Sequence, residues 1–150
     1  MTPKSPRDPQ VLKNRRDELL GYHLAELGGG RCRYEWTPGD SVSNPAGFVH
    51  GGYLGVLVDD VCGTAVVSIL DEWRAYPTAS MHVDYIRGLR IGETYQAHGV
   101  VVRAGRKLTV ADCAVRDASG RLLVRGSCTF VLDLEGTELA GFSALDPEPA

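Results

Sequence analysis

A polar turn that runs straight into a long apolar segment constrains the fold more than any other feature of this chain. Residues 44–52 read Asn-Pro-Ala-Gly-Phe-Val-His-Gly-Gly, and residues 53–69 are apolar apart from Asp59, Asp60 and two small hydroxyl residues. Apolar residues on nearly every side predict a buried helix over residues 52–72. The amides at a helix start suit a negative or polarised oxygen, and a carboxylate on a core helix is unfavourable unless it is used or satisfied. The junction therefore indicates catalysis.

The rest of the chain predicts one antiparallel sheet. Five segments have strand patterns, and turn residues separate the last three of them: 31–37, 78–87, 93–103, 107–116 and 121–132. We therefore expect an α+β protein in which a strand precedes the helix and a meander of four strands follows it. An amphipathic helix is predicted over residues 9–27, with a possible break near Gly21, and residues 28–30 end it.

The chain is expected to contain three parts. Residues 1–30 would be an N-terminal helical extension, residues 31–132 the main domain, and residues 133–150 an acidic, flexible tail. The apolar fraction of 43%, the charged fraction of 23% and the net charge of −3 are typical of a globular protein and give no general attraction to nucleic acid. The acids at positions 59 and 60 argue against a membrane span, and the polar N-terminus is not a secretory signal. We expect a cytoplasmic protein.

The four cysteines do not predict a metal site. They stand at positions 32, 62, 113 and 128, without a Cys-x-x-Cys pair or a histidine at ligand spacing. Cysteines in apolar segments behave as small hydrophobic residues. We therefore expect reduced, structural thiols and no bound metal.

Helix geometry separates the parts of the candidate site. Asp59 and Asp60 lie about 100° apart around a helix, so both are not expected to face one pocket, and periodicity does not choose between them. Gly51 and Asp59 are eight residues apart, which is about 12 Å along the axis. A donor and a base must both lie about 3 Å from a reacting carbonyl. Two antiparallel copies of the helix satisfy this, and the unpaired edges of a single sheet also favour pairing. We expect a homodimer with shared sites; a dimer of dimers stays open.

The motif resembles that of a known family. Asn-x-x-Gly-x-x-His-Gly-Gly followed by Leu-x-Asp on a long helix is similar to the hotdog-fold thioesterases, in particular their phenylacetate-pathway (PaaI-like) branch. The resemblance extends over residues 35–132 and includes the strand that opens at Thr78 and the basic turn Gly105-Arg106-Lys107. It implies a hotdog fold, in which an antiparallel sheet wraps around one long central helix, and hydrolysis of acyl-coenzyme A thioesters.

The resemblance also implies the roles of individual residues. Asp59 would act as general base or as nucleophile, and Thr78 would hold Asp59 or the attacking water. The Gly51 amide would polarise the thioester carbonyl, and Gly52 beside it would bind substrate. Asn44 would orient the nucleophile or the carbonyl, and His50 would brace the loop or act directly. A thioester has a good leaving group, so a carboxylate and an oxyanion donor suffice without a metal or a cofactor.

Coenzyme A carries phosphates, so cations are expected around the mouth of the pocket. Five basic residues at strand ends and turns are candidates: Arg87, Arg90, Arg103, Arg106 and Lys107. Two other functions remain open, a non-catalytic acyl-CoA-binding protein and an acyl-thioester dehydratase or hydratase, although the latter usually needs a catalytic histidine as well. The acyl group is not predicted, and a carrier-protein thioester is an alternative substrate.

Overall fold

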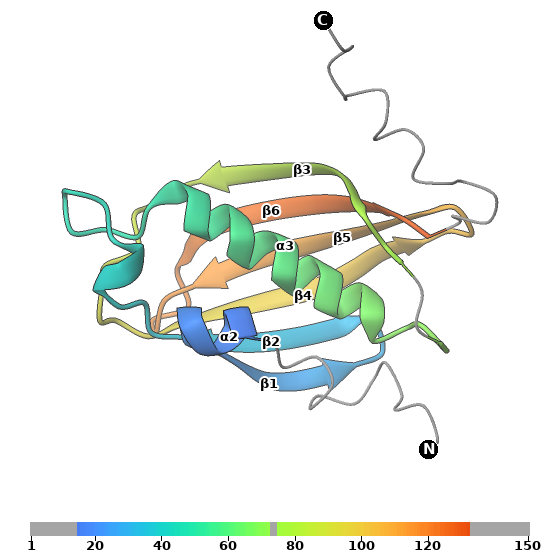
Figure 1. Ribbon diagram of the computed structural model, residues 1–150, viewed down its shortest axis with the longest axis horizontal. Helices are drawn as coiled ribbons and strands as arrows, with labels where there is room; N and C mark the ends of the chain where they lie inside the picture. Colours follow the sequence, from blue (N-terminus) through green and yellow to red (C-terminus); the bar gives the residue numbers. More distant parts are fainter. Residues whose placement is uncertain (1–14, 73–74, 133–150) are drawn as a thin grey trace, which may run out of the picture.

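One long helix lies across a face of a single antiparallel sheet in the computed structural model (Figure 1). The structure describes residues 15–72 and 75–132. Its elements are α2 (Arg15–Leu20), β1 (Tyr22–Gly28), β2 (Arg31–Trp36), η1 (Asp40–Val42), α3 (Gly51–Val67), β3 (Thr78–Tyr85), β4 (Tyr95–Ala104), β5 (Leu108–Arg116) and β6 (Leu122–Val131). None of the helices in these ranges has the length and apolar character needed to cross a membrane.

The strand order confirms the predicted α+β class and the hotdog architecture. The six strands follow the order β1-β2-β4-β5-β6-β3, and every neighbouring pair is antiparallel. The prediction of a four-strand meander is wrong for β3, which pairs with β6 and not with β4. The reason is that α3 crosses the sheet between β2 and β3 and delivers β3 to the far edge (Figure 1).

The helix predicted over residues 9–27 is wrong from Tyr22 onward. Helix α2 ends at Leu20, and Gly21 adopts a positive φ of 77° with its amide bonded to the Asp17 carbonyl, as at many helix ends. The chain then continues as β1, which pairs with β2, so the sheet begins before residue 31. Tyr22 packs edge-on against Trp36 at 5.2 Å, and this tertiary contact favours the strand over the helix. Residues 9–14 and the predicted tail 133–150 lie outside the described residues.

Helix α3 packs closely on the sheet because the strands present small residues beneath it. Pairing across β2, β4, β5 and β6 aligns one row of such residues: Cys32, Gly99, Cys113 and Gly126. A Cβ atom on Gly99 would lie 2.7 Å from the Val61 carbonyl oxygen, and one on Gly126 would overlap Val58. Glycine at these positions therefore fixes how near the helix lies to the sheet.

All four cysteines are buried and form no disulfide, which confirms the prediction of structural thiols. The Cys32 thiol donates to the Val61 carbonyl at 3.1 Å, and the Cys62 thiol donates to the Ala111 carbonyl at 3.5 Å. Burial raises the pKa of Cys32 to about 12. A raised pKa keeps the Cys32 thiol protonated near neutral pH, and the protonated form is a weak nucleophile.

Candidate active site

Asp59 and Thr78 form the central contact of the site. Asp59 is half-buried on α3, and Thr78 is the exposed first residue of β3. The Thr78 hydroxyl donates a 2.7 Å hydrogen bond to Asp59 Oδ1. The second carboxylate oxygen makes no hydrogen bond within the described ranges. The structure thus brings together the two residues that the sequence pattern named, and leaves one carboxylate oxygen available to a water or a substrate.

A cavity of about 250 Å³ opens beside this pair. Asp60 lines it together with Asp59, so the expectation that the two acids face different environments is wrong. The cavity runs along the flank of α3, where it contacts two adjacent faces of the helix. The two acids still differ, because the hydrogen bond from Thr78 goes to Asp59.

Asp17 of α2 also lines this cavity, and the sequence did not predict it as a site residue. Asp17 is only 7% exposed and lies on the cavity wall opposite the start of β3. Tyr34 lines the wall as well, and its hydroxyl lies 2.9 Å from that of Thr64. Burial raises the pKa of Tyr34, and the neighbouring Asp17 adds to the shift. One acid in a charged, polar segment has no sequence signature that could have indicated this position.

His50 caps the N-terminus of α3. Its Nδ1 accepts a 3.0 Å hydrogen bond from the Gly52 amide, so this nitrogen carries no proton in the structure. This is the bracing arrangement considered for His50, and it engages the Gly52 amide that was expected to bind substrate. Of the described residues, none accepts a hydrogen bond from the Gly51 amide, which is left as the open donor at the helix start.

Asn44 shapes the loop before the helix. Its Oδ1 accepts hydrogen bonds from the amides of Ala46 at 2.9 Å and Phe48 at 3.1 Å. The backbone N–H of Asn44 in turn donates to the Phe48 carbonyl at 2.7 Å. The side-chain carbonyl is thus engaged in its own loop, as in an Asx turn. If Asn44 orients a nucleophile or a carbonyl, as the resemblance implies, its side-chain NH2 group is the donor that would do so.

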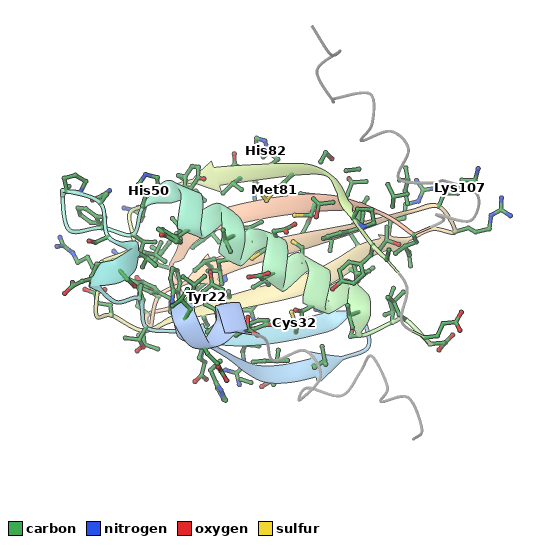
Figure 2. All side chains as sticks on the ribbon, in the orientation of Figure 1. Tyr22, Cys32, His50, Met81, His82 and Lys107 are labelled. Atoms are coloured by element: carbon green, nitrogen blue, oxygen red, sulfur yellow. The ribbon has the colours of Figure 1, made fainter. Side chains whose placement is uncertain are left out.

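The two halves of the site lie apart in one chain. Figure 2 shows His50 at the N-terminal end of α3, whereas Asp59 follows Gly51 by eight residues, about 12 Å along the axis. A single carbonyl group therefore does not reach both Gly51 and Asp59 of the same chain.

The basic residues do not surround one pocket mouth within a chain. Arg87 follows β3, whose last residue, Tyr85, contacts Gly51 at the start of α3. Arg103 lies near the end of β4, and Arg106 and Lys107 belong to the β4–β5 turn. Figure 2 shows Lys107 at the opposite end of the molecule from His50. Arg90 stacks 5.2 Å over the Phe48 ring instead. These basic residues therefore do not lie together within one chain.

A larger hollow of about 520 Å³ lies on the sheet face opposite α3. Two of the arginines that line it are engaged within the sheet: Arg33 bonds Glu26 at 2.8 Å, and Arg125 bonds Asp84 at 2.7 Å. Arg125, followed by His82, holds the pKa of the Asp84 carboxyl below its usual range. The hollow lacks the carboxylate–hydroxyl contact of the smaller cavity, so we place the candidate active site at Asp59.

Comparison with known proteins identifies the family. The family model described as Thioesterase superfamily matches residues 46–124, which is more than half of the chain and runs from within the polar turn to the first residues of β6. The chain therefore belongs to the thioesterase superfamily.

Individual proteins are also similar to this chain. A proposed esterase of Caenorhabditis elegans is 28% identical over 88 residues, which cover 57% of this chain; the chain spans about half the length (51%) of that relative. A conserved protein of Pseudomonas aeruginosa is 27% identical with a TM-score of 0.77, over 83% of this chain and 98% of the other.

Two more distant structures share the fold. A proposed thioesterase of Ralstonia eutropha, related to phenylacetic acid degradation, is 21% identical with a TM-score of 0.76 over 83% and 98% of the two chains. A Streptococcus mutans protein bound to acetyl-CoA is 22% identical with a TM-score of 0.68 over 74% and 87%.

Proposed function

We propose that this protein hydrolyses acyl-CoA thioesters to the free acid and coenzyme A. The observation that carries the proposal is the 2.7 Å contact of Thr78 with Asp59 at the mouth of a cavity, in a chain of the thioesterase superfamily. Asp59 acts as the base on water or as the nucleophile, with Thr78 holding one carboxylate oxygen. The Gly51 amide receives the negative charge that develops on the carbonyl oxygen.

Acyl-CoA is the favoured substrate class because proteins of the same fold bind acetyl-CoA or coenzyme A. One relative is bound to acetyl-CoA, and another, from Streptococcus pneumoniae, is bound to coenzyme A. We also propose that the chain belongs to the phenylacetate-pathway branch, which the fold of the Ralstonia eutropha protein supports. Aryl-acetyl thioesters therefore belong among the first substrates to examine.

We further propose that two copies of the chain share each site. Strand β3 is an edge of the sheet, and apolar side chains are exposed along it and just after it, including Met81 at 46% and Ile86 at 49%. Exposed edges of this kind favour pairing with another strand. Antiparallel pairing of β3 with its copy runs the two α3 helices in opposite directions. The Gly51 amide of one copy then approaches Asp59 of the other.

The same pairing explains the separated cations. An antiparallel partner places its β4–β5 turn beside the helix-start end of the first chain. Arg87 of one copy can then flank the phosphates of one coenzyme A together with three cations from the other copy: Arg103 near the end of β4, and Arg106 and Lys107 in the turn that follows.

A thiol-release assay over a panel of acyl-CoA thioesters tests the proposal. The panel contains acetyl, butanoyl, octanoyl and phenylacetyl thioesters, and a reaction without substrate measures any signal from the protein's own cysteines. We expect turnover of at least one thioester and a loss of about 100-fold or more in Asp59→Asn, because the base or nucleophile is removed. Asp60→Asn is the matched control and should retain activity.

Three other results would contradict the proposal. Saturable acyl-CoA binding without thiol release would identify a non-catalytic binding protein. Hydration of an enoyl thioester would identify a hydratase. Equal losses in the two aspartate variants would reject Asp59 as the catalytic carboxylate.

A further inference from the structure

Tyr85, at the end of β3, contacts the first residue of α3. Its hydroxyl donates a 2.9 Å hydrogen bond to the Gly51 carbonyl oxygen, across 34 residues of sequence. Its ring lies 3.5 Å from the position that a Cβ atom of Gly51 would take. The tyrosine side chain is 56% exposed, so this contact is made at the surface and not in the core.

The peptide unit between Gly51 and Gly52 is held at both ends. Tyr85 binds its carbonyl oxygen, and His50 Nδ1 accepts from its amide at 3.0 Å. Two consecutive glycines leave the backbone at this point free to rotate, since no side chain restricts it. The two hydrogen bonds restrain this peptide, which is joined through the Gly51 Cα to the peptide that carries the Gly51 amide.

Strand β3 therefore connects to both halves of the site. Thr78, its first residue, binds the Asp59 carboxylate, and Tyr85, its last residue, binds the peptide at the helix start. The strand is also the edge at which a second copy would pair. Its two hydroxyl groups thus tie the carboxylate and the oxyanion donor to one rigid element.

We propose that Tyr85 is a positioning residue for the Gly51 amide, an inference that rests on the proposed thioesterase function. The amide stabilises an oxyanion only if its hydrogen is aimed at the place where the negative charge develops. Tyr85 keeps that direction through the Gly51 carbonyl and does not itself contact the substrate. Such a role acts on the chemical step more than on substrate binding.

The decisive variant is Tyr85→Phe, which removes the hydroxyl and keeps the ring. We expect kcat for the best acyl-CoA substrate to fall about ten-fold while KM stays within about two-fold, because an oxyanion donor loses its alignment. The melting temperature should be unchanged, since the contact is exposed. Tyr53→Phe is the matched control: Tyr53 lies in the first turn of α3, and its hydroxyl has no hydrogen-bond partner in the described ranges. Its kcat should equal that of the wild type.

A double-variant cycle separates positioning from a general effect. If Tyr85 and His50 hold the same peptide, Tyr85→Phe should lower kcat by less than about two-fold in a His50→Ala background. The inference would be overturned if the falls in kcat caused by Tyr85→Phe and His50→Ala were fully additive. It would also be overturned if Tyr85→Phe had the kcat of an active wild-type protein. A fall in kcat matched by a fall in melting temperature would also overturn it, in favour of a purely structural contact. A wild-type protein inactive on the whole panel would reject the proposed function, and this inference with it.

Discussion

Two adjacent aspartates line one cavity, and the hydroxyl group of Thr78 binds one of them. Asp59 receives the 2.7 Å hydrogen bond from Thr78, and this contact fixes the direction of its carboxylate. The resemblance to known thioesterases named this pair, whereas helix periodicity alone could not choose between Asp59 and Asp60. Asp17 and Tyr85 were not predicted, because each reaches the site through a tertiary contact that leaves no local pattern in the sequence.

The hydroxyl of Thr78 can be tested directly. Thr78→Val preserves the shape of the side chain and should lower kcat about ten-fold, since the carboxylate loses its aligning hydrogen bond. Thr78→Ser keeps the hydroxyl and should retain most of the activity. Steady-state kinetics of the two variants make the comparison; equal activity of the valine and serine variants would show that the hydroxyl has no role.

At the scale of elements, the position of α3 depends on small residues in the sheet beneath it. Gly126→Ala would bring a Cβ atom into overlap with Val58, so we expect a loss of about 1–3 kcal/mol in the free energy of unfolding. Gly39→Ala is the control, because a Cβ atom there has no neighbour within 4 Å and φ is −96°. Urea unfolding measures both, and an unaffected Gly126→Ala protein would contradict the close packing described here.

Strand β3 provides the second test at this scale. Met81→Lys places a charge on the exposed edge, and charged edges resist strand pairing. We expect this variant to dissociate into monomers and to lose activity together with dimer formation. Val102→Lys is the control, since Val102 is 60% exposed on β4, an interior strand. Analytical ultracentrifugation and the thiol-release assay measure the two properties; a fully active monomer would refute the shared site.

The sequence predicted most elements but not their neighbours. Hydrophobic periodicity and turn residues placed α3 and five strands to within a few residues, because these signals are local. The position of β3 beside β6 and the strand β1 in place of a helix both depend on contacts between distant segments. Tyr22 is the clear example, since its packing on Trp36 outweighs the helical pattern around it.

For the whole molecule, the buried thiols predict how stability depends on pH. Burial raises the pKa of Cys32 to about 12 and also raises that of Cys113. A raised pKa means that the unfolded chain loses these protons first, so the stabilising contribution is complete below about pH 8.5 and is lost as the pH rises toward the folded-state pKa.

Unfolding in urea at pH 8 and pH 10 measures this effect. The free energy of unfolding should be lower at pH 10 than at pH 8. The decrease should be smaller in Cys32→Ala than in the wild type, and the two decreases should differ by up to about 1.4 kcal/mol for each pH unit. The comparison removes the contribution of other groups that titrate in the same range. An identical decrease in the two proteins would contradict the assignment to Cys32.

Each proposed site combines the Gly51 amide of one chain with Asp59 of another, and a mixture of two inactive variants tests this arrangement. Gly51→Pro removes the amide hydrogen at a position where helices accept proline, after a His50 whose ψ of 134° suits a following proline. Asp59→Asn removes the carboxylate.

When the two proteins are unfolded together and refolded in equal amounts, about half of the dimers are mixed, and each mixed dimer keeps one complete site. We predict recovery of about a quarter of wild-type activity. A mixture that is no more active than its parents, although mixed dimers are present, would contradict the shared site.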